Sequence, residues 1–205
     1  MYNSQSSLAV TNCAFTKNEG GGMHNNSASS PTVTKCTFTE NEGGGMSNER
    51  SSSPAVTNCT FTGNTASSGG GMYNYSASSP TVTYCTFTRN DGGGICNVNS
   101  SPTVTNTILW GDFPSAEFEL FSKDEYAADP SSPIVTYSCV QGGDDVAGNI
   151  SSNPLFVDTP SNVQLQAGSP CIDKGTDEGA PSTDILGVTR PQGARYDMGA
   201  YEYAE

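Results

Sequence analysis

The chain has 205 residues and a net charge of −13, from 21 acidic and 8 basic residues. This acidity argues against binding to nucleic acid or to an anionic membrane surface, because phosphate groups attract lysine and arginine. No apolar run approaches the roughly 18 residues of a membrane-spanning helix, so we expect no membrane insertion.

A repeat organises most of the sequence. Each copy contains short apolar segments rich in Val, Thr and Phe, separated by Gly, Asn, Ser and Pro, which is typical of short strands and turns rather than helices. The residue before each valine segment recurs at intervals of 23, 23, 26, 22 and 31 residues. One such unit cannot bury its apolar face alone, so the copies must stack. The marker residues are Leu8, Pro31, Pro54, Pro80, Pro102 and Pro133.

We therefore expect an all-β parallel solenoid of about six coils with three short strands each. Equivalent residues of stacked coils lie above one another and form columns. One inward column is Val10, Val33, Val56, Val82, Val104 and Val135. We place Phe15, Phe38, Phe61, Phe87 and Ile108 in a second, which leaves Leu109 on the outward side.

A cysteine column and an asparagine column are predicted to be structural ladders. Side chains stacked on parallel strands point the same way, so we expect buried thiols rather than a disulfide or a metal site. Asparagine tolerates left-handed backbone at corners and can bond to the neighbouring coil. The cysteines are Cys13, Cys36, Cys59 and Cys85, and the asparagines are Asn18, Asn41, Asn64 and Asn90, with Asp112 next in line. Cys96 is expected to be exposed and reactive.

Outward threonines form the one regular surface, which includes Thr34, Thr39, Thr83 and Thr88. Three interpretations stay open: a face for a glycan or protein partner, an ice-binding array by analogy, or ordinary exposed strand residues. Ala9, Ala14 and Ala55 interrupt the array, which weakens the ice-binding alternative.

The fifth connection, from Gly111 to Ser132, is longer than the others. We expect Leu120 to point inward there and the remainder to form an inserted loop. Such insertions on a regular rod often carry binding sites. Phe113 and Tyr126 are therefore the aromatic candidates for a glycan or partner contact.

The last 65 or so residues depart from the repeat. Asp144 and Asp145 are the calcium candidates, against the alternative of a solvated loop, and no other cofactor is expected. The segments VQLQ and PCID are predicted strands, and Arg190 is predicted to pair with Asp197. Met198, Tyr201 and Tyr203 are expected to cover an apolar end. A disulfide between Cys139 and Cys171 is left open.

The SPTVTxCTFTxN and GGGMYN patterns resemble the right-handed parallel β-helix repeats of large bacterial surface and secreted proteins, including the polymorphic outer-membrane repeats. The tail, from NPLFVDTPSNVQLQ to RYDMGAYEY, resembles the choice-of-anchor domain that often closes such helices. This resemblance implies a right-handed β-helix over residues 1–140 and a capping segment over 141–205, packed on the last coil. The chain opens inside a coil without a cap, so we expect a fragment of a longer protein, either monomeric or in end-to-end contact through the uncapped N-terminal coil.

The resemblance implies a non-catalytic, adhesin-like stalk on the cell surface or outside a bacterium, with a glycan or surface protein as partner. The alternative is a carbohydrate-active enzyme, similar to a polysaccharide lyase, or its inactive remnant. Lyases of this fold use a Lys or Arg base beside acids that hold calcium. The basic candidates are scattered along the sequence without an acidic cluster, and they are Lys17, Lys35, Arg50 and Arg89. The single histidine, His24, is expected at an exposed strand position.

Overall fold

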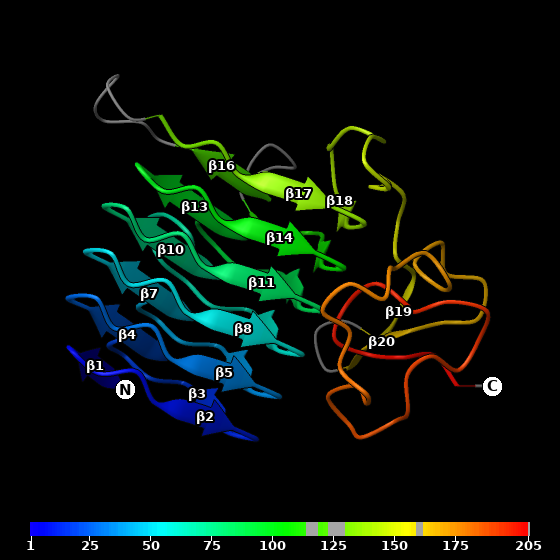
Figure 1. Ribbon diagram of the computed structural model, residues 1–205, viewed down its shortest axis with the longest axis horizontal. Helices are drawn as coiled ribbons and strands as arrows, with labels where there is room; N and C mark the ends of the chain where they lie inside the picture. The colour runs from blue at the N-terminus through cyan, green and yellow to red at the C-terminus, as the bar shows by residue number, and fades with distance from the viewer. Residues whose placement is uncertain (114–118, 123–129, 159–161, 205) are drawn as a thin grey trace.

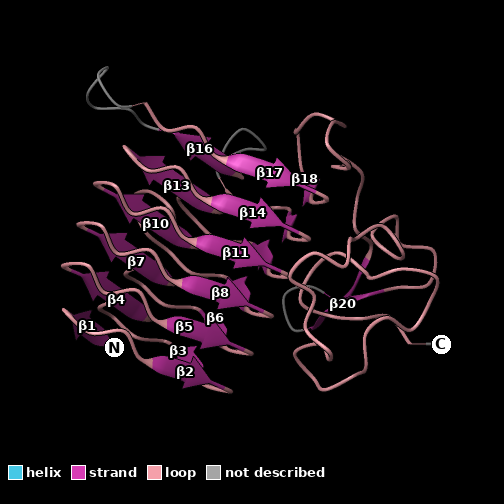
Figure 2. Ribbon diagram, in the orientation of Figure 1, coloured by secondary structure: helices cyan, strands magenta, loops and turns pink. Residues whose placement is uncertain are grey.

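The computed structural model describes residues 1–113, 119–122, 130–158 and 162–204, and within these ranges the regular secondary structure is all β. Figure 1 shows a stack of parallel strands with the C-terminal part of the chain beside it. Figure 2 shows that this second part consists mostly of loops. In the described ranges, no helix has the length and apolarity that a membrane crossing requires.

Three parallel sheets of six strands form the stack, and every third strand of the chain enters the same sheet. Three consecutive strands thus make one coil. The first sheet contains β1 (Tyr2–Ser4), β4 (Met23–Asn26), β7 (Met46–Glu49), β10 (Met72–Tyr75), β13 (Ile95–Val98) and β16 (Leu120–Ser122). The second contains β2 (Ala9–Thr11), β5 (Thr32–Thr34), β8 (Ala55–Thr57), β11 (Thr81–Thr83), β14 (Thr103–Thr105) and β17 (Ile134–Thr136). The third contains β3 (Ala14–Thr16), β6 (Thr37–Thr39), β9 (Thr60–Thr62), β12 (Thr86–Thr88), β15 (Ile108–Leu109) and β18 (Cys139–Val140).

The core lies between the sheets and consists of columns of identical side chains. Val33 pairs in register with Val56, so both point inward, and both are fully buried. The rings of Phe15, Phe38, Phe61 and Phe87 stack face to face, with successive centroid distances of 4.8, 4.6 and 4.4 Å. Leu120 also packs on this core, as expected. The predicted all-β parallel solenoid of three-strand coils is confirmed.

The phenylalanine column continues differently from the sequence prediction. Leu109, not Ile108, pairs with Phe87 and joins the core. Ile108 pairs with Thr86 on the outward side, where it is nevertheless buried. The prediction was wrong by one residue, because the fifth coil has no phenylalanine to mark the inward position.

Asparagine side chains form a continuous hydrogen-bonded ladder at one corner. The amide nitrogen of Asn18 donates to Oδ1 of Asn41 at 2.7 Å, and Asn41 and Asn64 donate in turn to the next asparagine at 2.8 and 2.9 Å. Asn90 donates to Oδ1 of Asp112 at 2.8 Å, which ends the ladder on an acid. These bonds satisfy amides that would otherwise be buried without partners.

Cysteines line the corner between the second and third sheets. The backbone N–H of Cys36 donates to Sγ of Cys59 at 3.4 Å, and burial raises the pKa of the Cys59 thiol. All seven cysteines lie in the described ranges, and none forms a disulfide. Cys36, Cys59 and Cys85 are buried as expected, but the prediction was wrong for Cys13, which is exposed in the first coil. The expectation of an exposed Cys96 was wrong. The loop before β10 covers it so closely that a Cβ atom on Gly69 would lie 3.0 Å from the Cys96 Cβ.

Candidate functional site

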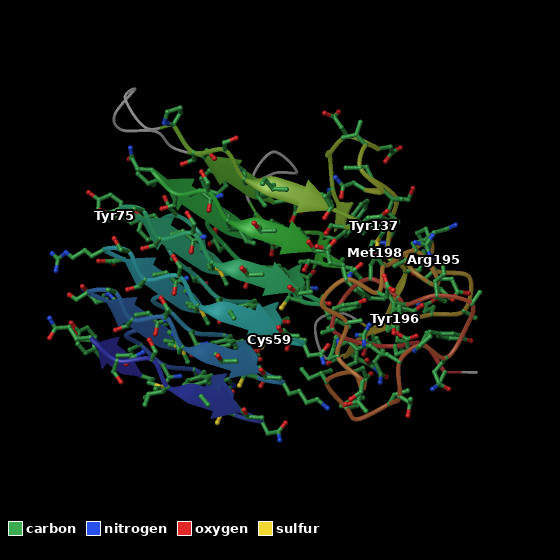
Figure 3. All side chains as sticks on the ribbon, viewed as in Figure 1. Cys59, Tyr75, Tyr137, Arg195, Tyr196 and Met198 are labelled. Carbon is green, nitrogen blue, oxygen red and sulfur yellow. The ribbon has the colours of Figure 1, made fainter. Side chains whose placement is uncertain are left out.

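The C-terminal segment, residues 141–204, packs on the outward face of the third sheet. Ile108 forms an apolar cluster there with Leu165 and Met198. The backbone N–H of Ala200 donates to Oγ1 of Thr86 at 3.0 Å. Figure 3 shows Tyr196 and Met198 where this segment meets the strands. The third sheet is therefore covered on the side that the sequence pattern assigns to solvent.

Polar side chains at the corner between the second and third sheets hold the segment along the flank of the rod. Lys35 Nζ donates to Thr183 Oγ1 at 2.7 Å, and Asn58 Nδ2 donates to the Thr183 carbonyl oxygen at 2.7 Å. Asn106 Nδ2 donates to the carbonyl oxygen of Thr176 at 3.1 Å. These contacts extend from the second coil to the fifth. The C-terminal segment therefore contacts more of the rod than the last coil, on which alone it was predicted to pack. The domain boundary near residue 140 stays a prediction.

A buried ion pair fixes the interior of the C-terminal segment. Arg190 Nη1 lies 3.1 Å from Glu202 Oε2, and both side chains are fully buried. The guanidinium carbon of Arg190 lies 4.5 Å from the centroid of the Tyr84 ring, so the ion pair also contacts the rod. Burial lowers the pKa of Arg190 and raises that of Glu202.

The predicted partner of Arg190 was therefore wrong. Asp197 offers Arg190 only its backbone carbonyl oxygen, at 3.1 Å. The Asp197 carboxylate instead accepts the backbone N–H groups of Asp173 and Tyr203, at 2.8 and 2.7 Å. It thus ties two turns of the segment together.

One antiparallel pair lies in the C-terminal segment: β19 (Phe156–Asp158) pairs with β20 (Asn162–Leu165). The second strand covers most of the predicted VQLQ strand. The PCID stretch, by contrast, is a turn rather than a strand. A hydrogen bond from Ile172 N to the Ser169 carbonyl oxygen, at 3.2 Å, closes it.

A cleft of about 500 Å³ opens where this pair approaches the fourth and fifth coils. The rod contributes one wall and the C-terminal segment the other. The rod residues are Thr88, Arg89, Trp110, Gly111 and Phe113, and the segment residues are Asn153, Leu155, Phe156 and Gln166. Backbone bonds from Trp110 to Phe87 and from Phe113 to Asn90, at 3.1 and 2.9 Å, anchor the aromatic wall to the fourth coil.

The cleft combines aromatic rings with polar groups that have spare hydrogen-bonding capacity. Arg89 is exposed, and none of the ion pairs between described residues involves it. Asn153 uses Oδ1 to accept the Leu155 N–H at 3.0 Å, and Gln166 donates Nε2 to the Phe156 carbonyl oxygen at 2.7 Å. No hydrogen bond between described residues uses Asn153 Nδ2 or Gln166 Oε1, so these two atoms are available to a ligand. Flat apolar faces beside amide and guanidinium groups suit a ring that carries hydroxyl groups.

A larger hollow of about 680 Å³ lies inside the C-terminal segment, beside Asp173, Asp197 and Tyr203. Its carboxylates already have structural partners. Asp173 Oδ1 accepts the Arg195 N–H at 2.7 Å, and Asp197 holds the two turns described above. We therefore regard the aromatic cleft, despite its smaller volume, as the candidate functional site.

The structure distributes the predicted site residues unevenly. Phe113 lines the cleft and is 52% exposed. Tyr126 lies outside the described residues. Thr34 and Thr39 are half-buried on different sheets, while Thr83 and Thr88 are buried and cannot belong to an open threonine face. Thr88 nevertheless lines the cleft.

The calcium candidates are exposed in the turn after β18. Asp144 and Asp145 lie on the surface there. In the part of the chain that the structure describes, no group of three or more His, Cys, Asp or Glu side chains is arranged to hold a metal ion. A calcium site at these two residues stays a prediction.

Sequence reasoning missed most of the cleft. Trp110 had an available signal, since it is the only tryptophan and directly precedes the long fifth connection. Asn153, Phe156 and Gln166 carried no signal, because only the packing of the C-terminal segment brings them to the rod.

Comparison with known families adds one finding to this geometry. The family model described as "Right handed beta helix region" matches residues 1–109, more than half of the chain. The match covers all three strands of each of the first five coils, and it ends beside Trp110. No curated protein and no solved structure matches the chain.

Proposed function

The chain belongs to the right-handed β-helix family, and on that premise we propose that it is a non-catalytic, adhesin-like module that binds a glycan in the Trp110 cleft. It would act at the cell surface or outside a bacterium. Here the rod serves as a stalk, and the C-terminal segment completes the binding site.

The observation that carries this proposal is the composition of the cleft. Trp110, Phe113 and Phe156 supply apolar ring faces that stack on the C–H face of a sugar. Arg89 and the amides of Asn153 and Gln166 supply directional donors and acceptors for hydroxyl groups. A cleft of about 500 Å³ falls within the usual range for small-ligand sites, which is roughly 300 to 1,000 Å³.

The alternative, a carbohydrate-active enzyme, would use the same cleft with Arg89 as the base. Of the two basic residues best suited to that role, Lys35 already donates to Thr183 and lies outside the cleft lining. Arg89 alone lines the cleft, so a single substitution addresses both functions. Release of unsaturated sugar by the protein, lost on Arg89→Gln, would favour the enzyme.

Binding to a printed array of microbial, plant and animal glycans tests the proposal. We expect binding that Phe113→Ala and Arg89→Gln each weaken about tenfold, which corresponds to roughly 1.4 kcal/mol. Tyr75→Ala is the matched control, since Tyr75 is an aromatic residue on the opposite side of the rod (Figure 3). Binding that Tyr75→Ala abolishes and Phe113→Ala leaves intact would place the site elsewhere.

A further inference from the structure

The asparagine ladder ends on an acid that has no counterpart in the other coils. Asp112 occupies the place that Asn90, Asn64 and Asn41 hold in the coils below it. Its Oδ1 accepts both the backbone N–H and the side-chain amide of Asn90, at 2.6 and 2.8 Å. One carboxylate oxygen therefore does the work of an asparagine Oδ1. The other, Oδ2, stands where an asparagine would present an N–H donor.

A second acid, Glu119, contacts Asp112. Glu119 accepts the Asp112 backbone N–H with Oε1 at 3.0 Å, and the two side chains contact each other. Asp112 is 4% exposed and Glu119 is 1% exposed. Asp112 Oδ2 and Glu119 Oε2 are both buried, and neither has a hydrogen-bond donor among the described residues. Two ionised carboxylates in this position would be strongly unfavourable.

The described groups that hydrogen-bond to the side chains of this pair are neutral, namely the amide of Asn90 and backbone groups of Asn90, Gly111 and Asp112. The backbone of Gly94 lies beside Asp112 Oδ2, and it is neutral as well. Arg89 and Asp91, the charged neighbours of Asn90 in sequence, are exposed at the surface. The packing is also tight: a Cβ atom on Gly94 would lie 2.6 Å from Asp112 Oδ2, so the Gly94 backbone closes one side of this oxygen.

Ionisation of both acids is opposed by their surroundings. Burial, followed by the charge of Glu119, raises the pKa of Asp112, and burial likewise raises the pKa of Glu119. The ordinary pKa range of these two groups is about 4 to 4.5, so in the unfolded chain both are ionised above that pH. Over the pH range above this, the folded protein therefore binds a proton that the unfolded chain has released.

We propose that Asp112 and Glu119 share one proton between Oδ2 and Oε2, and that this proton holds the rod wall of the cleft in place. This inference rests on the proposed function and concerns the regulation of the same site. Gly111 and Phe113 flank Asp112, and both line the cleft. When pH rises far enough, the proton leaves to solvent, two carboxylates face each other, and the Gly111–Phe113 wall separates from Glu119.

The sign of the pH dependence follows from linkage. Because the folded state retains a proton that the unfolded state has lost, stability is highest below the ordinary carboxyl range and falls as pH rises toward the raised folded value. One retained proton changes the unfolding equilibrium constant about tenfold per pH unit. Glycan affinity at the cleft should fall over the upper part of the same window.

Asp112→Asn is the decisive variant. Its Oδ1 still accepts from Asn90, and its amide N–H replaces the shared proton as a permanent donor to Glu119. We expect denaturation curves from about pH 4 to about pH 9 to give a pH slope that is shallower than wild type by about one proton. Above the ordinary carboxyl range, the infrared difference spectrum of wild type minus variant should contain the band of one protonated carboxyl group. Asp145→Asn, at an exposed acid, should leave both observables unchanged.

Identical pH slopes for wild type and Asp112→Asn, with no protonated-carboxyl band, would overturn the proposal. If Asp112→Asn does not fold, Glu119→Gln gives the same test from the other side of the pair. Stabilisation of wild type by calcium, reversed by a chelator and lost in Asp112→Asn, would also overturn it, because the pair would then bind a cation. None of these measurements needs a glycan, so a cleft that binds no sugar refutes only the proposed function, and parallel pH curves refute only the shared proton.

Discussion

The rod and the C-terminal segment reach order by different means. In the rod, equivalent residues about one coil apart repeat the same contact, as in the Phe38–Phe61 and Phe61–Phe87 stacks. In the C-terminal segment, single contacts bridge long stretches of chain, such as Lys35 to Thr183 across 148 residues. A repeated contact joins equivalent residues of neighbouring coils, so the period of the sequence identifies both partners. Each contact of the C-terminal segment instead depends on one particular pair of residues that no period relates.

The candidate site lies at the boundary between these two regions. Trp110 belongs to the end of the regular rod, and Phe156 belongs to the antiparallel pair of the C-terminal segment. Neither region contains the cleft alone. Perturbations of each region should therefore separate rod stability from site integrity.

Phe61→Ala should have the largest effect. The side chain is fully buried and stacks on a ring above and a ring below. Removal of a buried phenylalanine ring costs about 3 to 5 kcal/mol. The midpoint of denaturation by urea should fall accordingly for the whole protein, whereas Thr81→Ala, at an exposed position of β11, should stay within about 0.5 kcal/mol of wild type. Equal effects of the two substitutions would contradict the column-stacked core.

Arg190→Ala should affect the C-terminal segment more than the rod. The substitution leaves Glu202 buried without its counter-charge, which costs about 3 kcal/mol or more. Limited proteolysis should then cut within residues 141–204 while the coils persist as a resistant fragment. Arg195→Ala is the matched control, because Arg195 is exposed on the same segment (Figure 3). Uniform cleavage of the rod in Arg190→Ala would show that the two regions unfold together.

Tyr84→Phe should have the smallest effect of the three. The ring beneath Arg190 remains, and only the hydrogen bond from the hydroxyl group to the Thr176 carbonyl oxygen is lost. Such a bond contributes about 1 kcal/mol. Amide hydrogen exchange should therefore rise around Thr176 and stay unchanged in β12. An unchanged exchange rate around Thr176 would show that this hydrogen bond does not help to hold the segment on the rod.

The sequence was sufficient for the rod because its period lets one coil predict the next. Even the error at Ile108 had a remedy in the sequence. Phe87 follows Val82 by five residues, and the same count from Val104 gives Leu109. The tail could not be derived in this way. The pairing of Arg190 with Glu202 rather than Asp197, and the burial of Thr88, depend on how a non-repeating segment folds back on the rod.

The candidate site was only partly predictable for the same reason. Phe113 was identified because it lies in an insertion, but Asn153 and Gln166 reach the cleft only through tertiary packing. No spacing links them to Trp110.

The most direct test of the cleft uses the single tryptophan of the chain as a reporter. Trp110 lines the cleft, so titration with a glycan that binds on the array should change its fluorescence emission, with a saturable curve that Phe113→Ala shifts to about tenfold higher concentration. A glycan that binds the protein tightly without altering Trp110 emission, and with equal affinity for Phe113→Ala, would contradict the proposal that the cleft between rod and C-terminal segment is the binding site.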